Sequence, residues 1–472
     1  MAYTKHFRPL TILATVMVAL ISSHATHANQ EQSTEDTLLV GISAVDTKPE
    51  VGIPLAGYGA KERRIKGFID WHNTHEHSFF FRPSNGTHTP IRSKVMVLQK
   101  ANRKLVFISL DVIGIEDRFV EDLAYELRPL GIRKQDIVMS GTHTHSGPGT
   151  LSRKLGLELV AVDLFKRKNY NYMLKKVEQS VHLALSQLEP AELFTSSFEA
   201  QGMQRNKFRF KDQEHYNKKA SFLLARSLNT HQWLGGMVNF AVHGGGMPVE
   251  LLVYSSDFPG QVEINLEKEL QIQNHVSAQK PVILFMNGAE GDVAVPERGV
   301  EYIEQKGAEF AAQAQPALQI QNMKRVSPEF SVQQKEVWMG IPGSPLKYCG
   351  GGFLKKSPIP LRIPLVGFMD QRAPLSVVRV GEITMFSWPG EPSTELGFRT
   401  QRLAEEYGHK DAWVLGLVND YMTYFTTKHE YHEGAYDSCS SLYNWRAGKR
   451  VLRHYEKVLS RMKHKNTKNN LL

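Results

Sequence analysis

Short apolar runs alternate with amphipathic stretches along most of the chain. Apolar runs bounded by Gly, Pro or Asn are typical of buried strands, and a 3.6-residue periodicity predicts helices. The strands we expect are Leu38–Ser43, Lys94–Gln99, Leu105–Leu110, Asp136–Met139, Trp233–Val242, Pro281–Met286, Ile383–Ser387 and Trp413–Leu417. The helices we expect are Arg118–Leu130, Tyr170–Gln187, Phe258–Leu270 and Glu395–Tyr407. This alternation predicts an α/β fold.

Five of these strands run directly into loops that combine glycine with polar or ionisable side chains. Loops at strand ends converge while the strands stay rigid, so sites gather there in α/β sheets. The side chains that we expect to share one cleft are His143, His145, His243, Asp292, Glu391 and the tyrosines beyond Asn419.

The N-terminus reads as a secretory signal. Lys5 and Arg8 precede an apolar run over residues 10–21, and small and polar residues follow it. We expect residues 1–28 to be a signal peptide cleaved after Ala28, with Ala25 as the second choice, and an uncleaved anchor as the alternative. Residues 29–37 form a polar leader. The mature protein is therefore expected to be secreted or periplasmic.

Composition narrows the class of protein without deciding it. The 472 residues are 41% hydrophobic and 22% charged, which is ordinary for a soluble globular chain. Part of the net charge of +9 lies in residues 446–472, which we expect to be a basic C-terminal helix or tail. A basic tail suits an anionic membrane surface or nucleic acid, and a solvated last helix is the alternative. With no nucleic-acid motif elsewhere, we expect no nucleic-acid partner.

Two cysteines cannot form a disulfide framework in a chain of this length. In an exported protein Cys349 and Cys439 can pair, and two free thiols remain the alternative. The segment from Lys61 to Pro90 reads as a long loop, because it is rich in Pro, Gly and Asn. Its four histidines have no helical face to gather them, so a metal site there is not favoured.

His143 and His145 are two residues apart after a strand. On extended backbone such side chains share a face, which suits a metal pair or one ligand plus one catalytic group. His243 precedes three glycines, and Glu391 follows Pro-Gly. Each signal alone has an ordinary alternative, a hydrogen-bonded loop or a surface acid. Together, imidazoles and a carboxylate suit zinc, which lowers the pKa of its bound water to about 7.

Five blocks, in order, resemble the neutral/alkaline (non-lysosomal) ceramidase family. The most specific is Ser140–Pro148, which reads SGTHTHSGP. The others are Val40–Asp46 with Gly57-Tyr58, Phe240–Gly244, Trp388–Glu391, and Tyr421–Thr427 followed by Glu430-Tyr431 and Tyr436. The resemblance implies one catalytic domain over residues 38–445, with mixed β-sheets flanked by helices and the site at strand-end loops.

The resemblance also implies the residues of the site. Zinc would be held by His143, His243, Glu391 and Tyr424. The amide substrate would be lined by His145, Arg205 and Tyr436. The arginine block departs from the family, which has Asn-Arg-Ser-Pro where this chain has Gln204-Arg205-Asn206-Lys207. Asp111 and Asp292 are candidates to orient the ligands from behind, with turn residues as the alternative.

Three departures bear on the substrate. Ala294 stands where the family has a serine considered important for activity, so no acyl-enzyme can form at this position. The chain stops soon after the tyrosine block, where full ceramidases have a further β-sandwich module. The segment Lys61–Pro90 is an insertion that can line or cover the pocket.

The leading hypothesis is an exported zinc-dependent amidohydrolase that cleaves the N-acyl bond of a ceramide-like lipid by zinc-activated water. Its partners would be a lipid or N-acyl amide substrate and a peripheral membrane surface. Two alternatives stay open: a zinc hydrolase of another N-acyl amide or ester, and a non-catalytic lipid-binding member of the family.

Overall fold

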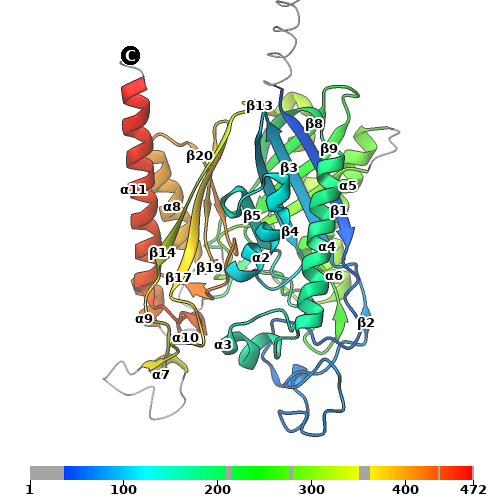
Figure 1. Ribbon diagram of the computed structural model, residues 1–472, viewed down its shortest axis with the longest axis vertical. Helices are drawn as coiled ribbons and strands as arrows, with labels where there is room; N and C mark the ends of the chain where they lie inside the picture. Colours follow the sequence, from blue (N-terminus) through cyan, green and yellow to red (C-terminus); the bar gives the residue numbers. More distant parts are fainter. Residues whose placement is uncertain are drawn as a thin grey trace, which may run out of the picture.

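A nine-stranded mixed sheet forms the centre of the protein, which is described here from a computed structural model (Figure 1). The structure describes residues 37–469 except 209–211, 213, 276–279, 350–361, 434 and 435. The sheet has the order β11-β9-β8-β6-β1-β3-β4-β5, and β13 pairs with β6 off this path. The strands are β1 (Leu39–Asp46), β3 (Arg92–Lys100), β4 (Arg103–Leu110), β5 (Ile137–Gly141), β6 (Glu189–Glu199), β8 (Lys219–Ser227), β9 (Trp233–Phe240), β11 (Val282–Asn287) and β13 (Lys324–Val326).

The central sheet folds over on itself between β1 and β6. These two strands pair only at Leu39–Pro190 and Val40–Glu189. Beyond that short contact β11 lies against β3, β4 and β5, where the Ser109 hydroxyl donates to the Phe285 carbonyl at 2.8 Å. Apolar side chains from both layers fill the space between them. The C-terminal ends of β5, β9 and β11 therefore reach the same end of the molecule.

Helices cover the outer faces of both layers. The amphipathic helices α2 (Asp117–Leu127) and α4 (Arg167–Ser186) pack on β1, β3, β4 and β5. Helices α5 (Asp257–Gln273) and α6 (Val300–Ala314) pack on β9 and β11. This burial of one face of each helix against a sheet accounts for the α/β pattern in the sequence.

A second, four-stranded sheet carries the remaining part of the chain, at the left of Figure 1. Its order is β14 (Phe330–Trp338), β17 (Arg372–Val380), β18 (Ile383–Ser387) and β20 (Asp411–Leu415). One face joins the central core, and α8 (Thr394–Glu406) and α11 (Trp445–Asn469) cover the other. Short pairs complete the strands: β2 (Gly86–Thr87) with β10 (Val253–Tyr254), β7 (Arg205–Asn206) with β12 (Val293–Ala294), β15 (Gly343–Pro345) with β16 (Arg362–Pro364), and β19 (Glu391–Pro392) with β21 (Tyr424–Phe425).

The α/β fold with mixed sheets flanked by helices is confirmed, and each expected strand and helix has a counterpart within a few residues. The sequence pattern did not identify β6, β8, β14, β17 or α6. The segment 61–90 is mostly loop, with only a 3-10 turn at Lys61–Arg63 and β2 inside it. The basic C-terminal stretch forms α11, whose apolar side chains pack against the second sheet.

Cys349 and Cys439 form a disulfide. It joins the short helices α7 (Leu346–Cys349) and α10 (Tyr436–Ser440), with α9 (Lys428–Glu433) between α10 and β21 in the sequence. Among the described residues, no helix is both long enough and apolar enough to cross a membrane. The expected signal peptide lies outside the described residues.

Candidate metal centre

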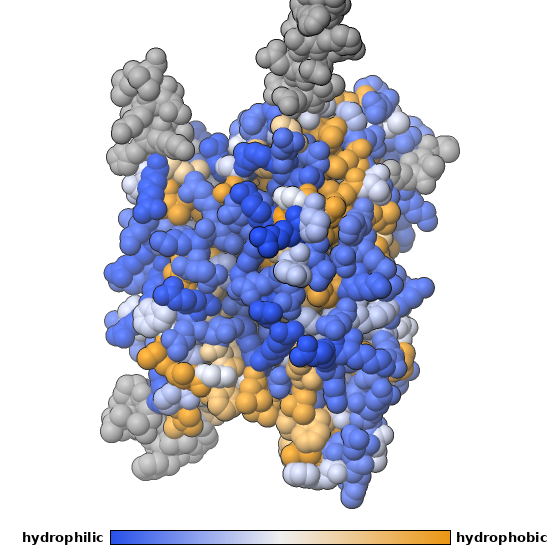
Figure 2. Space-filling view, in the orientation of Figure 1, coloured by the Kyte–Doolittle hydropathy of each residue, from blue (hydrophilic) through white to orange (hydrophobic). Residues whose placement is uncertain are grey.

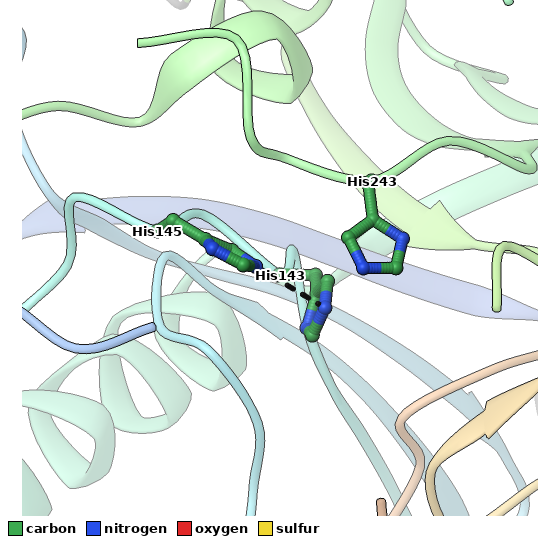
Figure 3. Close-up of side chains that lie close together, drawn as sticks. All are labelled: His143, His145 and His243. Atoms are coloured by element: carbon green, nitrogen blue, oxygen red, sulfur yellow. Dashed lines mark hydrogen bonds between the residues drawn. The ribbon is translucent and has the colours of Figure 1, made fainter. Parts of the chain in front are cut away.

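Three histidines from two strand-end loops meet at the end of the folded sheet (Figure 3). His143 and His145 follow β5, and His243 follows β9. One ring nitrogen from each lies within 4.8 Å of the others, and the His143 ring lies between the other two. The ring centroids of His143 and His243 are 4.5 Å apart. His143 and His243 are buried.

The hydrogen bonds of the two buried rings fix which nitrogen faces inward. Nδ1 of His143 lies 2.6 Å from the Ile113 carbonyl, and Nδ1 of His243 lies 3.0 Å from the Glu290 carbonyl. A carbonyl accepts only, so Nδ1 carries the proton in the neutral rings and Nε2 presents a lone pair. Backbone carbonyls behind a ring are a common way to orient a metal-binding histidine.

Glu391 faces both lone pairs. Its Oε2 lies 3.3 Å from Nε2 of His143 and 3.1 Å from Nε2 of His243. Its Oε1 accepts a hydrogen bond of 2.6 Å from the Tyr421 hydroxyl, whereas Oε2 is buried without a hydrogen-bond partner. Burial opposes ionisation of this carboxyl, whereas the two histidines, when they carry a second proton, outweigh it and hold its pKa well below the usual range.

Tyr424 closes the cluster. β19 and β21 pair in parallel with Glu391 opposite Tyr424, which brings the tyrosine to the histidines. Its hydroxyl lies 3.1 Å from Nε2 of His243. Burial raises the pKa of the phenol well above its usual value. A bound cation acts in the opposite sense, because it favours the ionised form of an oxygen ligand.

These four side chains fit a divalent metal ion. Two unprotonated Nε2 atoms, one carboxylate oxygen and one phenol oxygen face each other in a buried space. Desolvation, and then the nearby Lys207, lower the pKa of His243 to about 4, so the ring stays neutral near pH 7. The Tyr424 hydroxyl and the Lys207 ammonium can each donate to Nε2 of His243. Nε2 of His143 and Oε2 of Glu391, 3.3 Å apart, are both acceptors, and they repel unless a cation lies between them. Nitrogen and oxygen donors of this kind suit zinc.

The expectation of extended backbone at His143 is wrong, although the two side chains do meet. His143 has a φ of 65°, in the left-handed region that non-glycine residues rarely adopt. A turn, and not strand alternation, brings Nε2 of His145 to 3.5 Å from Nε2 of His143. Gly244 permits the close approach of the second loop, because a Cβ there would lie 2.6 Å from the His143 carbonyl. Backbone strain of this kind is commonly held at functional sites.

His145 lies beside the cluster with one nitrogen free for other contacts. Its Nδ1 is buried and has no hydrogen-bond partner. Burial, and then the neighbouring His143 and His243, lower its pKa well below the usual value. The ring packs edge-on against Tyr58, with centroids 4.5 Å apart.

Tyr436 lies at the outer side of the cluster, on α10. Its ring is 5.8 Å from that of Tyr424, and the residue is 71% exposed. Its hydroxyl can therefore reach both solvent and a molecule that approaches the histidines. The disulfide at Cys439 fixes the helix that carries it.

Arg205 does not join the cluster. It is exposed, and its Nε donates to the Pro296 carbonyl at 3.0 Å. Lys207 lies there instead: its Nζ is 3.2 Å from Nε2 of His243 and 5.2 Å from the centre of the Tyr424 ring. Two hydrogen bonds to Asp292 explain why Lys207 and not Arg205 reaches the site. The Asp292 carboxylate accepts from the Asn206 side-chain amide at 2.9 Å, and the Asp292 backbone carbonyl accepts from the Lys207 N–H. These bonds lead the chain past the site two residues after the arginine.

Asp111 and Asp292 support the loops without touching the ring nitrogens. Asp111 accepts from the buried Lys94 ammonium at 2.8 Å and from the Thr142 hydroxyl at 3.2 Å. The Ile113 carbonyl, and not Asp111, orients His143. Asp292 also accepts two hydrogen bonds from Thr394 at the start of α8. Ala294 forms a bridge with His243, so the position of the family serine is next to a candidate ligand.

Sequence reasoning missed Lys207 and the Glu290 carbonyl, whereas Tyr421 is one of the tyrosines beyond Asn419 that it expected in the cleft. Tyr421 lies in the tyrosine block, but the block does not show which of its rings reaches Glu391. Tyr421 also lines an apolar pocket beside the cluster, together with Ile113, Leu157, Val162 and other side chains of the β4 and β5 loops. The pocket shares Ile113 and Tyr421 with the surroundings of His143 and Glu391.

The protein thus combines an α/β fold, in which the central mixed sheet folds over on itself, with a cluster of imidazoles and a carboxylate at the strand ends. This combination is typical of a metal-dependent protein. The family model described as neutral/alkaline non-lysosomal ceramidase, N-terminal, matches residues 39–335. The chain therefore belongs to the neutral ceramidase family.

Curated relatives agree with this family. The chain is 23% identical to neutral ceramidase B of Dictyostelium discoideum over 317 residues, 62% of this chain and 42% of that protein. It is 27% identical to the neutral ceramidase of Pseudomonas aeruginosa over 127 residues, 26% of this chain and 19% of that protein. The matched parts thus span less than half the length of each of these relatives.

The fold also has a counterpart among solved structures. The crystal structure of neutral ceramidase from Pseudomonas aeruginosa superposes with a TM-score of 0.75 at 19% identity, over 91% of this chain and 75% of that chain. A structure described as ceramidase complexed with C2 gives a TM-score of 0.74 at 18% identity. The catalytic fold expected from the sequence is thereby confirmed.

We expect removal of the Tyr421 hydroxyl to weaken zinc binding about 10–100-fold, because Glu391 loses the contact that leaves Oε2 directed at the histidines. His143→Ala should abolish measurable binding. Competition with a chromophoric chelator measures both. The matched control is Tyr170→Phe, which removes a hydroxyl that donates to Asp122 at 2.8 Å, away from the cluster. Retention of wild-type affinity in both Tyr421→Phe and His143→Ala would contradict the assignment.

Proposed function

We propose that this protein is an exported, zinc-dependent amidohydrolase that cleaves the N-acyl bond of a ceramide-like lipid. Family membership supports amide hydrolysis of a lipid. The observation that most directly supports zinc is that two imidazole Nε2 atoms converge on Oε2 of Glu391. This oxygen has no hydrogen-bond partner. The residues that would hold the metal are His143, His243, Glu391 and Tyr424.

When bound, zinc would polarise the amide carbonyl and make a water molecule nucleophilic near neutral pH. Hydrolysis adds that water across the C–N bond: the acyl carbon gains the hydroxyl and the amine gains a proton. Nδ1 of His145 is placed to exchange that proton, because it is buried beside the cluster without a partner. The Tyr436 hydroxyl can donate to the oxygen on which charge develops.

Lys207 supplies positive charge at the same place. Its ammonium group is half-buried next to His243 and Tyr424, and it lies 3.7 Å from the Asp437 carboxylate. A positive group in a partly dehydrated site stabilises a developing oxyanion more than it does in water. We assign to Lys207 the role that sequence resemblance gave to Arg205.

The nucleophile must come from solvent in this account. Ala294 has no hydroxyl, so the chain offers no serine at the position that neighbours His243. The apolar pocket beside Tyr421 suits an acyl chain, since its lining is mainly Leu, Ile, Val and Phe. The amine half of the substrate would then face Tyr436 and solvent.

Export is supported by two features. The first 28 residues have the charged start, apolar middle and small-residue end of a signal peptide. Cys349 and Cys439 are joined, and structural disulfides persist in oxidising compartments.

A second candidate function is hydrolysis of another N-acyl amide or an ester. The replacement of the family serine by Ala294 favours it, because that change alters the group next to His243. A panel of N-acyl lipids, N-acyl amino acids and esters separates the two.

For the leading function we expect release of fatty acid from ceramide, lost with chelator and restored by zinc. Chromatography of the products measures it on the mature protein. Release from N-acyl amino acids or esters with ceramide untouched would move the assignment to the second candidate. No release from any substrate by protein that holds zinc would contradict both.

Lys207→Met should lower kcat/KM about 100–1000-fold, the range for loss of one group that stabilises an oxyanion. Lys207→Arg should restore part of the loss, because the positive charge returns. Arg205→Met is the matched control and should change the rate less than about 3-fold, since its guanidinium contacts Pro296 instead. Equal losses in Arg205→Met and Lys207→Met would contradict the role given to Lys207.

A further inference from the structure

Large apolar side chains gather on the outside of the molecule at the end where the strand-end loops open. Figure 2 shows them around α3 (Leu155–Leu157) and below α10, while the face above is mostly hydrophilic. We call six of these residues the apolar rim: Phe68, Trp71, Leu159, Val160, Val366 and Phe368. Trp71 and Phe68 are the most exposed, at 75% and 67%, and the other four are 38–55% exposed. Contiguous apolar surface on a soluble protein marks a place of contact with another apolar surface.

Three segments from different parts of the chain build this rim, and backbone contacts join them. The Arg64 guanidinium donates to the Leu159 carbonyl at 3.0 Å, which links the first segment to the second. The Gly156 N–H donates to the Phe368 carbonyl at 3.3 Å, which links the second to the third. The three segments that carry the rim are therefore neighbours at this end of the molecule.

The loop that carries Phe68 and Trp71 is clamped to the body of the protein. The Asp70 N–H donates to the Phe79 carbonyl, and the Phe79 N–H donates to the buried Asp163 carboxylate at 3.0 Å. Asp163 directly follows the π-helical turn Glu158–Val162, which presents Leu159 and Val160. The exposed aromatics are thus held in place by buried hydrogen bonds.

The rim adjoins the candidate metal centre. The Gly57 N–H donates to the Ala161 carbonyl at 2.9 Å, next to Val160 in the chain. A Cβ at Gly57 would lie 2.7 Å from the His145 ring, so this backbone lies directly on the ring. One layer of chain separates the rim from the side chain that we assign to proton exchange.

Basic side chains accompany the apolar ones. Lys61, Arg64 and Lys66 directly precede Phe68, with Glu62 as the one acid among residues 61–68. Arg82 is exposed on the same loop. Trp and Phe beside Lys and Arg are the combination that places a protein at a bilayer interface, where rings enter the headgroup region and cations meet anionic lipids.

We propose that the apolar rim docks the protein on a lipid bilayer whose surface carries anionic headgroups. Phe68, Trp71, Leu159 and Val160 enter the headgroup region, and Lys61 and Lys66 contact the lipid phosphates. The orientation this gives rests on the proposed function, because it turns the His145 side of the metal centre toward the membrane that would hold an N-acyl lipid. The insertion at residues 61–90 is then a docking loop.

Sedimentation with lipid vesicles tests the docking without any turnover. The mature protein should bind phosphatidylcholine vesicles that contain phosphatidylglycerol, and bind pure phosphatidylcholine more weakly. Phe68→Ser with Trp71→Ser should weaken binding at least about 10-fold, because two interfacial rings are lost. The matched control, Tyr125→Ser with Ile272→Ser, removes side chains that are 70 and 67% exposed outside the rim, and should bind as the wild type does.

Failure of the wild type to bind phosphatidylglycerol vesicles would overturn the proposal, and so would equal binding by the rim variant and the wild type. A third outcome would also overturn the proposal: the wild type is a dimer that does not bind vesicles, and the rim variant is a monomer. The rim would then be a contact between two copies of the protein. If the variant does not fold, Val366→Ser with Phe368→Ser carries the same test. Turnover of a water-soluble short-chain amide by the rim variant tests the proposed function separately.

Discussion

The site depends on lone pairs that converge in a buried space. Hydrogen bonds from Nδ1 to the Ile113 and Glu290 carbonyls leave Nε2 of His143 and His243 unprotonated, and both face Oε2 of Glu391. The contact between Nε2 of His143 and Oε2 of Glu391 is unfavourable by itself, because both atoms are acceptors and burial removes the water that would satisfy them. The surrounding fold must therefore hold these atoms close together. A cation bound among them would replace their mutual repulsion with attraction to the ion. Much of the surrounding structure serves this constraint.

Four strand ends hold the cluster. β5 and β9 deliver the histidines, and the turns after β18 and β20 deliver Glu391 and Tyr424. The backbone at His143 and Thr423 is left-handed, with φ values of 65° and 62°, which rigid neighbours must maintain. The Lys94–Asp111 pair, buried behind the His143 loop, is part of that support. The apolar rim lies at the same end of the molecule, so the candidate metal centre and the proposed membrane contact face the same way.

Much of this arrangement could be predicted from the sequence, because it follows from local pattern. Apolar runs that end in Gly-rich polar loops located β5, β9, β11, β18 and β20, and placed His143, His243 and Glu391 at one edge. Strands such as β14 were missed because they are half-exposed and rich in polar residues, which leaves no apolar run. Lys207 was missed for a different reason. Its place depends on bonds to Asp292, 85 residues away in the sequence, and no local pattern encodes that contact.

The most direct test of this account is the location of a bound metal ion. Anomalous diffraction at the zinc absorption edge, on crystals of the purified protein grown with zinc, would place the ion without reference to activity. The account predicts a peak among Nε2 of His143, Nε2 of His243 and Oε2 of Glu391. Absence of a peak there, or a peak only at the group of Glu50, Glu76 and His77, would contradict it.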